Sequence, residues 1–296
     1  MILVVGATGL VGGEVCRILA ERGDDVRALV RWTSDPDRVM ALRGLGAELV
    51  EGDLKRMDTL LAACDGVDAV VSTATATTSQ QEGDTIEAVD RDGQLALVDA
   101  ASQAGVRRFV FISFPPFPID SPLQSAKLAV ERRLAEGEME WVSVRAGPFH
   151  EVWLSSRLGA DPLGGTLRVY GSGEQKISWI SFRDVARFAA EAVGSPAARN
   201  RLLDIGGPSL SYHEVARVFE EETGHPIALE YVPVEALEAQ VAAGRNSLET
   251  SFATLILNVG LHGAPIDMEP VLRDFPRERE SVREYTRSLV AAAAQA

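Results

Sequence analysis

Short apolar segments alternate with helical patterns along the first half of the chain. The segments that read as strands are 2–5, 25–31, 47–53, 68–74, 107–113 and 140–147. Between them, apolar residues recur at helical spacing over 10–20, 36–45, 57–64, 90–104 and 127–135. Strands that alternate with helices imply crossover connections and therefore a parallel sheet. We predict an α/β fold in which helices cover both faces of a doubly wound parallel sheet.

The regular alternation ends after Gly147, where Gly and Pro become frequent in PLGG, YGSG and IGGPS. The predicted parts are a nucleotide-binding domain over 1–147 that takes back 181–205, a smaller interleaved substrate lobe made of 148–180 and 206–275, and a C-terminal helix and tail over 276–296. Within them we expect a strand running into a helix that Asp184 caps, a helix over 212–222, and an amphipathic helix over 277–293. This last helix either packs on the core or pairs two chains, so the protein is expected to be a monomer or a homodimer.

The stretch GATGLVGG follows the first strand and opens the first helix. Gly6, Gly9 and Gly12 are spaced three residues apart, which permits a tight turn, a close approach of a pyrophosphate and close packing of helix on strand. A pyrophosphate would then sit on the positive end of the helix. The sequence therefore predicts a Rossmann-type dinucleotide site. The backbone that forms it comprises Gly6, Ala7, Thr8, Gly9, Leu10, Val11 and Gly12.

The end of the second predicted strand indicates which dinucleotide binds. NAD sites place Asp or Glu there to bind the ribose hydroxyls, whereas this strand ends in Arg31, with Arg38 soon after. A guanidinium matches a phosphate in charge and in its fork of donors. We therefore predict that NADPH (NADP) is preferred over NADH; the alternative is that Arg31 is a solvated surface arginine.

The amino-acid composition limits the classes of molecule that the protein is expected to bind. The chain of 296 residues has 43 Asp and Glu against 29 Lys and Arg, and its net charge is -14. This balance disfavours nucleic acid and anionic membrane surfaces, and leaves a small-molecule substrate. Cys16 and Cys64 form no disulfide framework, and the spacing of His, Cys and carboxylates suggests no metal. With no bilayer-spanning segment and no signal-peptide core, the expected location is the cytoplasm.

The motifs together resemble a known family. GATGLVGG, Arg31, EGDL at 51–54 and VVSTA at 70–74 are similar to those of the atypical short-chain dehydrogenase/reductases. VRAGPFHE, SGEQKISWISFRDVA and LLDIGGPSLSYHEVA narrow the resemblance to the NmrA-like branch, and it extends to about residue 275. That branch includes quinone reductases, isoflavone-reductase-like enzymes and redox-sensing regulators.

The resemblance implies further contacts to the cofactor. It implies that Asp53 binds the adenine amino group with Leu54 against the ring, although Asp53 can equally cap the helix that follows it. It places Thr73 and Ala74 at the ribose and diphosphate. The resemblance also implies that Pro148 and Phe149 line the nicotinamide.

The catalytic residues of the resembled family are incomplete. Typical members use a Tyr, a Lys four residues later and an upstream Ser. Ser113 and Lys127 occupy the expected places, but Leu123 stands where the Tyr belongs. The intervening loop offers only Asp120 and the hydroxyls of Ser121 and Ser125 as proton donors. General acid–base catalysis accelerates a reaction about 100- to 10,000-fold. Without the tyrosine, ordinary reduction of a carbonyl group is therefore in doubt.

Three functions remain open. In the first, the protein is a reductase whose acceptor is a quinone or another conjugated molecule. The reduced form of such an acceptor is an anion that needs little help from an acid of the protein. Alternatively, the protein is a tailoring reductase or isomerase in which Lys127 is the acid or base, as the resemblance to isoflavone-reductase-like enzymes implies. The third possibility is a non-catalytic NADP(H) sensor that binds a protein partner. The first is our prediction: an NADPH-dependent oxidoreductase.

Several side chains carry two interpretations. Lys127 either binds the nicotinamide ribose and assists catalysis, or is a surface lysine paired with Glu131 one helical turn on. His150 is a candidate proton donor, although a lone histidine is more often structural. Aromatic side chains offer flat faces to a conjugated substrate, or else pack in the core. The substrate candidates are Phe114, Phe117, Trp153 and Tyr170, with Trp179 as a further aromatic residue.

Overall fold

The computed structural model describes residues 1–77 and 81–295, and these form two compact units. The first unit contains 1–114, 122–145 and 185–203, and the second contains 115–121, 146–184 and 204–296. The boundaries near 147, 181 and 205 lie within four residues of the predicted ones, and two segments are assigned differently. The segment 115–121 joins the second unit although it interrupts the first along the chain, and 276–296 belongs to the second unit as well. Among the described residues, the helices lack the combination of length and apolar character that crossing a bilayer requires.

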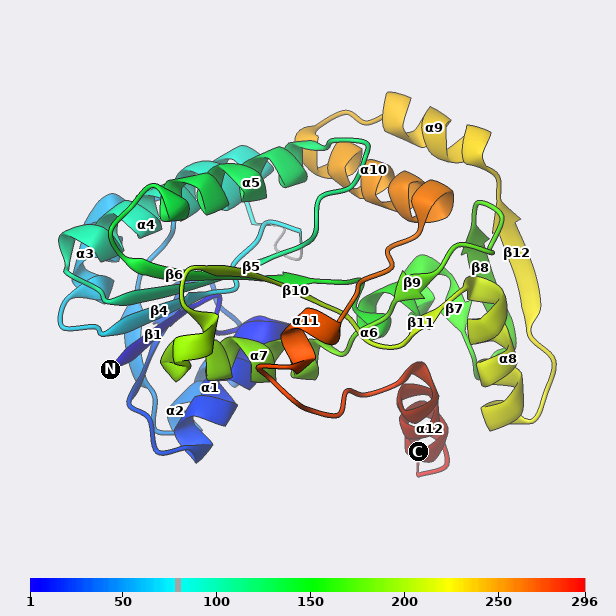
Figure 1. The fold of residues 1–296 in the computed structure, drawn as a ribbon, viewed down its shortest axis with the longest axis horizontal. Helices are drawn as coiled ribbons and strands as arrows, with labels where there is room; N and C mark the ends of the chain where they lie inside the picture. Colours follow the sequence, from blue (N-terminus) through cyan, green and yellow to red (C-terminus); the bar gives the residue numbers. More distant parts are fainter. Residues whose placement is uncertain (78–80, 296) are drawn as a thin grey trace. The chain divides into compact units, whose positions relative to one another are not determined.

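A seven-stranded sheet forms the centre of the first unit (Figure 1). Its strands are β1 (Ile2–Val5), β2 (Val26–Val30), β3 (Glu48–Glu51), β4 (Ala69–Ser72), β5 (Arg108–Ser113), β6 (Glu140–Ala146) and β10 (Arg201–Ile205). They are ordered β10-β6-β5-β4-β1-β2-β3, and the pairs from β3 through β6 are parallel. The predicted α/β fold with a doubly wound parallel sheet is confirmed. The chain winds outward in both directions from β1 and β4, which is where such sheets bind ligands.

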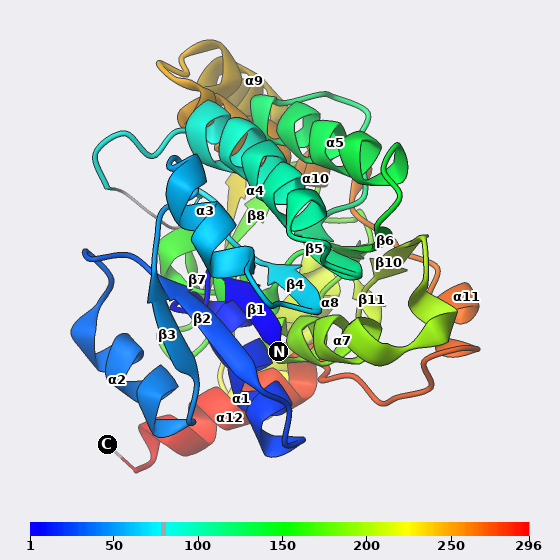
Figure 2. The same cartoon turned by 90° about the vertical axis from the view of Figure 1, so that its left-hand side faces the viewer.

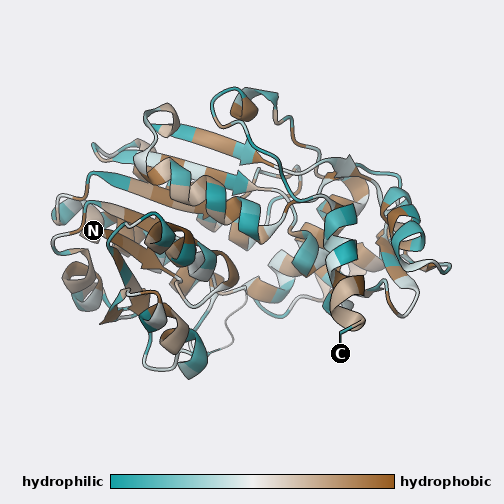
Figure 3. Ribbon diagram, turned by 90° about the horizontal axis from the view of Figure 1, so that it is seen from below, coloured by the Kyte–Doolittle hydropathy of each residue, from teal (hydrophilic) through white to brown (hydrophobic). Residues whose placement is uncertain are grey.

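Helices cover both faces of this sheet. They are α1 (Leu10–Glu21), α2 (Pro36–Gly44), α3 (Met57–Cys64), the π-helix η1 (Ile86–Gly93), α4 (Gln94–Gln103), α5 (Pro122–Ala135), α7 (Phe182–Gly194) and the short η3 (Pro196–Ala198). Figure 2 shows α3, α4 and α5 over one face, with α1 and α7 over the other. Because both faces are covered, the central strands are buried and mostly apolar, and much of the ribbon in the interior of the first unit is brown in Figure 3.

Four predicted helix starts need correction. The helix expected from residue 90 begins at Ile86, where the Thr85 side chain accepts from the backbone N–H of Ala88, and its first eight residues are π-helical. Helix α5 begins at Pro122 rather than Lys127, since proline fits a first helical turn. Asp184 does not cap α7 but lies inside its first turn. Helix α12 begins at Val282 behind a capping box, not at residue 277.

The second unit has its own small sheets and core. Its elements are α6 (His150–Trp153), η2 (Ser156–Leu158), β7 (Ala160–Asp161), β8 (Thr166–Tyr170), β9 (Ile177–Ser178), β11 (Ser209–Leu210), α8 (Tyr212–Thr223), β12 (Ala228–Val232), α9 (Val234–Ala242), α10 (Ser247–His262), α11 (Glu269–Leu272) and α12 (Val282–Ala293). Strands β12, β8 and β7 form one sheet, and β9 pairs with β11. Trp179, Tyr212 and Phe219 are the large side chains of its core. Val282 and Tyr285 join that core, so α12 packs on its own unit.

Candidate functional site

The glycine turn between β1 and α1 has the geometry that the sequence predicts. Gly6 has a φ of +83°, and a Cβ there would lie 2.7 Å from the backbone nitrogen of Ala74. Gly9 is the N-cap of α1 and supplies no side chain to bond the first-turn N–H groups. These donors and the positive helix end are therefore available to a pyrophosphate.

Gly12 sets how closely α1 approaches β1. A Cβ at Gly12 would lie 2.2 Å from the carbonyl oxygen of Gly6. Gly12→Ala is therefore expected to push α1 away from the turn and weaken dinucleotide binding at least about tenfold, because the phosphate donors move with the helix. Fluorescence titration with NADPH measures this. Gly44→Ala is the matched control, since a Cβ there meets nothing within 4 Å. Equal affinities for the two variants would contradict the prediction.

A cavity of about 370 Å³ opens beside this turn, in the first unit. It lies where β1, β2 and β4 end, at the point from which the sheet winds outward. The predicted cofactor residues that line it are Gly6, Thr8, Gly9, Arg31, Arg38, Asp53, Leu54, Thr73 and Ala74. Ala7, Leu10, Val11 and Gly12 shape the turn without lining the cavity. A cavity with phosphate donors at one wall and arginines at another fits a dinucleotide phosphate.

Asp53 is not a helix cap. Its side chain accepts from the backbone N–H of Lys55, whereas the N-cap of α3 is Arg56. The alternative interpretation of Asp53 as a cap is therefore wrong. Asp53 lines the cavity, as a residue that binds a base must.

Arg31 does not stand alone in solvent. Its Nη1 lies 2.7 Å from Oδ2 of Asp84, and the Lys55 ammonium lies 2.7 Å from Oδ1 of the same carboxylate. The Asp84 side chain is fully buried, and Arg38 donates to the carbonyl of Thr8 at 2.7 Å. The cavity wall thus carries two arginines, Arg31 and Arg38, and three carboxylates, Asp35, Asp53 and Asp84, with Lys55 paired to Asp84. Sequence reasoning missed Asp84 and Lys55, because no motif connects a loop aspartate to the end of a distant strand.

Lys127 is buried at the end of β5 rather than exposed. It is 7% exposed, and its ammonium lies 3.4 Å from Oδ1 of Asp90, 3.3 Å from the carbonyl oxygen of Ile112 and 4.8 Å from the centre of the Phe111 ring. Asp90 is itself fully buried and accepts from the backbone N–H of Ala76. The π-helix η1 carries Asp90 to this position, and π-helical turns are frequent at functional sites.

Glu131 has a different partner from the one considered for it. Its carboxylate accepts from Arg145 at 2.5 and 2.9 Å and from Ser143 at 2.6 Å. The interpretation of Lys127 as a surface lysine paired with Glu131 is therefore wrong. Burial alone raises the pKa of Glu131, but bonds from Arg145 and Ser143 outweigh it, and with help from the nearby Ser113 hydroxyl they hold the pKa below its usual value. Ser113 is buried at the end of β5, as expected.

The remaining predicted catalytic residue, His150, is in the second unit and has no exposed surface. It begins α6, and its ring stacks on Tyr285 of α12 at 4.6 Å between centroids. Pro148 and Phe149 precede it in the same unit, with Phe149 at the N-cap of α6. Their predicted contact with the nicotinamide remains a prediction.

The candidate substrate aromatics are distributed over both units. Phe117 and Trp153 are partly buried against the core of the second unit, and Phe114 belongs to the first. Tyr170 is 6% exposed and donates its hydroxyl to the carbonyl of Leu158. Trp179 is fully buried and is a core residue, with its indole N–H bonded to the carbonyl of Leu210.

The model of the NmrA-like family matches residues 1–285. The chain belongs to the NmrA-like family. The match covers both units, and the predicted family is therefore confirmed.

This NmrA-like protein is similar to a named reductase and to a protein named for a different role. It is 31% identical to the NAD(P)H azoreductase of Xenophilus azovorans over 94% of this chain and 92% of that protein. It is also 29% identical to the photosystem II assembly factor Ycf39 of Trieres chinensis, over 80% of this chain and 73% of the relative. The prediction of an NAD(P)H-dependent oxidoreductase is confirmed at this level of detail.

A solved structure shares the fold. The NADPH-dependent quinone oxidoreductase of Escherichia coli, in complex with NADPH, aligns with a TM-score of 0.79 and 20% identity. The alignment covers 98% of this chain and 100% of that chain. The comparison therefore supports the fold of the NmrA-like protein over its whole length.

Proposed function

We propose that this NmrA-like protein is an NADPH-dependent reductase of quinone-like or otherwise conjugated small molecules. The observation that carries the proposal is the buried pair of Lys127 and Asp90, together with Leu123 at the position where a tyrosine would donate the proton. Asp90 fixes the position of the Lys127 ammonium, and an ammonium fixed beside a reacting group stabilises negative charge that develops there. Such a site suits an acceptor whose reduced form is a delocalised anion.

The chemistry of the acceptor follows from what the site lacks. Hydride transfer to a quinone places the new charge on an oxygen conjugated with the ring, so water can supply the proton later. An isolated aldehyde instead produces a localised alkoxide, which needs an acid in the same step. The azo group acted on by the azoreductase relative is conjugated, like a quinone.

The first test is NADPH oxidation by the purified protein, followed by absorbance. The acceptors are a benzoquinone, a naphthoquinone, an azo dye, an enone and an aliphatic aldehyde, with NADH as the control donor. Turnover of the conjugated acceptors but not of the aldehyde, with NADPH preferred, is the expected result. Aldehyde reduction faster than quinone reduction would overturn the proposal.

A second function is supported by the missing tyrosine and by the relative named as a photosystem II assembly factor. In this alternative the protein binds NADP(H) and a protein partner, and transfers no hydride. Tight NADPH binding without turnover of any acceptor, combined with NADPH-dependent capture of one stable partner, would favour it.

Asp84 is expected to limit the affinity for NADPH. Its carboxylate pairs with Arg31 and Lys55, which are the cations that would face a 2′-phosphate. Asp84→Asn removes this competition and is expected to lower the Kd for NADPH several-fold, while the Kd for NADH changes little because NADH lacks the phosphate. Fluorescence titration with both nucleotides measures the effect. An equal change in the two Kd values would show that Asp84 acts on the fold of the loop and not on the phosphate.

A further inference from the structure

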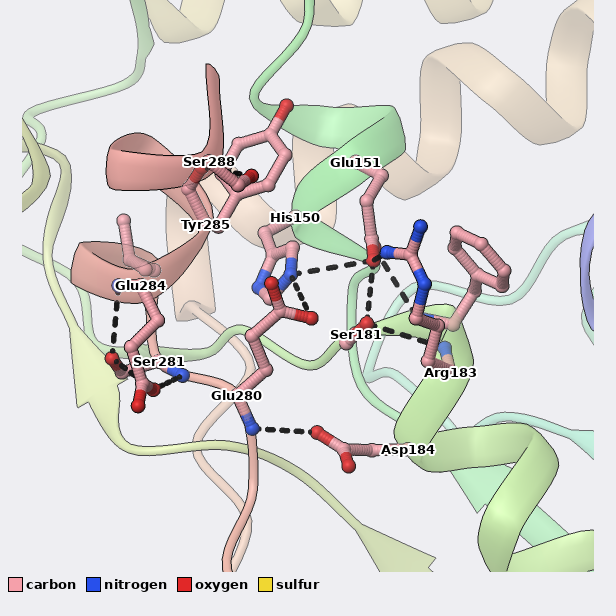
Figure 4. Close-up of polar contacts among 12 residues, drawn as sticks. His150, Glu151, Ser181, Arg183, Asp184, Glu280, Ser281, Glu284, Tyr285 and Ser288 are labelled. Carbon is pink, nitrogen blue, oxygen red and sulfur yellow. Dashed lines mark hydrogen bonds and ion pairs between the residues drawn. The ribbon is translucent and has the colours of Figure 1, made fainter. Parts of the chain in front are cut away.

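The second unit contains a cluster of side chains that the reductase function does not use. His150 and Glu151 begin α6, and Glu280 lies just before α12 (Figure 4). The Nε2 atom of His150 lies 3.4 Å from Oε1 of Glu151 and 3.9 Å from Oε2 of Glu280. One ligand atom from each residue lies within 4.8 Å of the other two.

The ring nitrogens of the histidine in this cluster lack hydrogen-bond partners among the described residues. His150 is fully buried, yet neither ring nitrogen is in hydrogen-bonding geometry with a described residue. Burying an imidazole without a hydrogen bond costs free energy, so native structures give such a group a partner. Its ring is held in place by stacking on Tyr285, with Nε2 directed between the two carboxylates (Figure 4).

Neighbouring side-chain and backbone groups hold the Glu151 carboxylate in position. Oε1 of Glu151 accepts from the Ser181 hydroxyl at 2.5 Å, and Oε2 accepts from the backbone N–H of Phe182 at 3.2 Å. Arg183 approaches Oε1 to 3.8 Å, but its side chain is half exposed and can turn into solvent. Ser181 and the backbone of Phe182 thus hold the Glu151 carboxylate in place beside the His150 imidazole.

We propose that His150, Glu151 and Glu280 bind a divalent transition-metal ion, with Zn²⁺ as the best-fitting ion. Zinc takes imidazole nitrogen and carboxylate oxygen ligands at about 2.0–2.2 Å, usually with four ligands. Two ligands of a tetrahedral ion are then about 3.4 Å apart, close to the His150–Glu151 separation. Glu280 is partly exposed and has room to close the remaining distance. Water supplies the fourth ligand.

The outer contacts fit a site that stabilises structure. Metal-bound carboxylates are normally oriented by outer hydrogen bonds, as Ser181 orients Glu151. The backbone N–H of Glu280 is itself fixed by Asp184 at 2.7 Å. An ion at this place would join the start of α12 to α6, whose sequence positions lie far apart. All residues of the site belong to the second unit.

The test is Zn²⁺ binding by the full chain after dialysis against a chelator. Calorimetric titration with ZnCl₂ is run on the wild type, Glu280→Gln and His150→Gln. The matched control is His213→Gln, because His213 and Glu174 form an exposed pair at 2.9 Å that could bind zinc adventitiously. MgCl₂ is the second control, since Mg²⁺ prefers octahedral oxygen ligands.

We expect the wild type and His213→Gln to bind one Zn²⁺ per chain, and Mg²⁺ to produce no comparable signal. Glu280→Gln is expected to bind at least tenfold more weakly. Its side chain is partly exposed, so circular dichroism can establish that it folds even where His150→Gln does not. Zn²⁺ should also raise the Tm of the wild type and not that of Glu280→Gln. No uptake by the wild type, or loss of uptake in His213→Gln instead, would overturn the site.

Discussion

Replacement of Lys127 by alanine is expected to lower kcat/KM for quinone reduction at least about 100-fold. Stabilisation of developing negative charge by one positioned cation is worth this much or more. The loss should appear mainly in kcat, because the ammonium acts on the transition state more than on the bound acceptor. Steady-state kinetics with NADPH and a naphthoquinone measure both terms.

Controls must separate this effect from loss of folding. Removing Lys127 leaves Asp90 buried and unpaired, and breaking a buried pair in this way costs about 3–5 kcal/mol. The double variant Lys127→Met, Asp90→Asn removes both charges and is expected to unfold at a higher temperature than Lys127→Ala while remaining inactive. Lys176→Ala removes an exposed lysine, and its activity and unfolding temperature should equal those of the wild type. Activity within threefold of wild type in the folded double variant would show that Lys127 is structural.

Arg31→Glu is expected to invert the dinucleotide preference. A charged hydrogen bond to phosphate is worth about 1.5–3 kcal/mol, so the KM for NADPH should rise about 10- to 100-fold. The new carboxylate can bind ribose hydroxyls, so the KM for NADH should stay constant or fall. The measurement is the ratio of kcat/KM for the two nucleotides.

Arg133→Glu is the matched control for this substitution. Arg133 pairs with Asp99 at 2.6 Å, so both variants place a glutamate against an aspartate. Arg133 does not line the cofactor cavity. The control should leave the nucleotide preference intact. An unchanged preference in Arg31→Glu would mean that Arg31 does not contact the 2′-phosphate.

Local patterns predicted those parts of the molecule that local physics determines. The strand Ile2–Val5 and the helix Met57–Cys64 have the predicted bounds, because apolar periodicity and flanking glycine or charge mark their ends. The glycine turn could also be predicted from the sequence, since its backbone geometry depends on residues next to one another. A buried parallel strand followed by such a turn has few alternative folds.

The partners of the charged residues could not be predicted in the same way. Lys127 was identified as a candidate from its place in the chain, but its pairing with Asp90 depends on how η1 packs against α5. Asp84 reaches Arg31 from a loop whose path the sequence does not specify. Glu280 meets His150 only after α12 has docked on the second unit. Each of these contacts is a product of tertiary packing, which spacing along the chain does not record.

The π-helix η1 makes the position of Asp90 sensitive to chain length. A π-turn holds one residue more than an α-turn, so deleting one residue between Asp90 and α4 would let the segment continue as an ordinary helix. Residues ahead of the deletion would then turn by about 100° relative to α4, which its buried Leu97 and Ala101 keep in place. Asp90 would leave Lys127 while the sheet stayed intact. Insertion or deletion of a single codon can thus create or remove the Lys127–Asp90 pair while the protein stays folded.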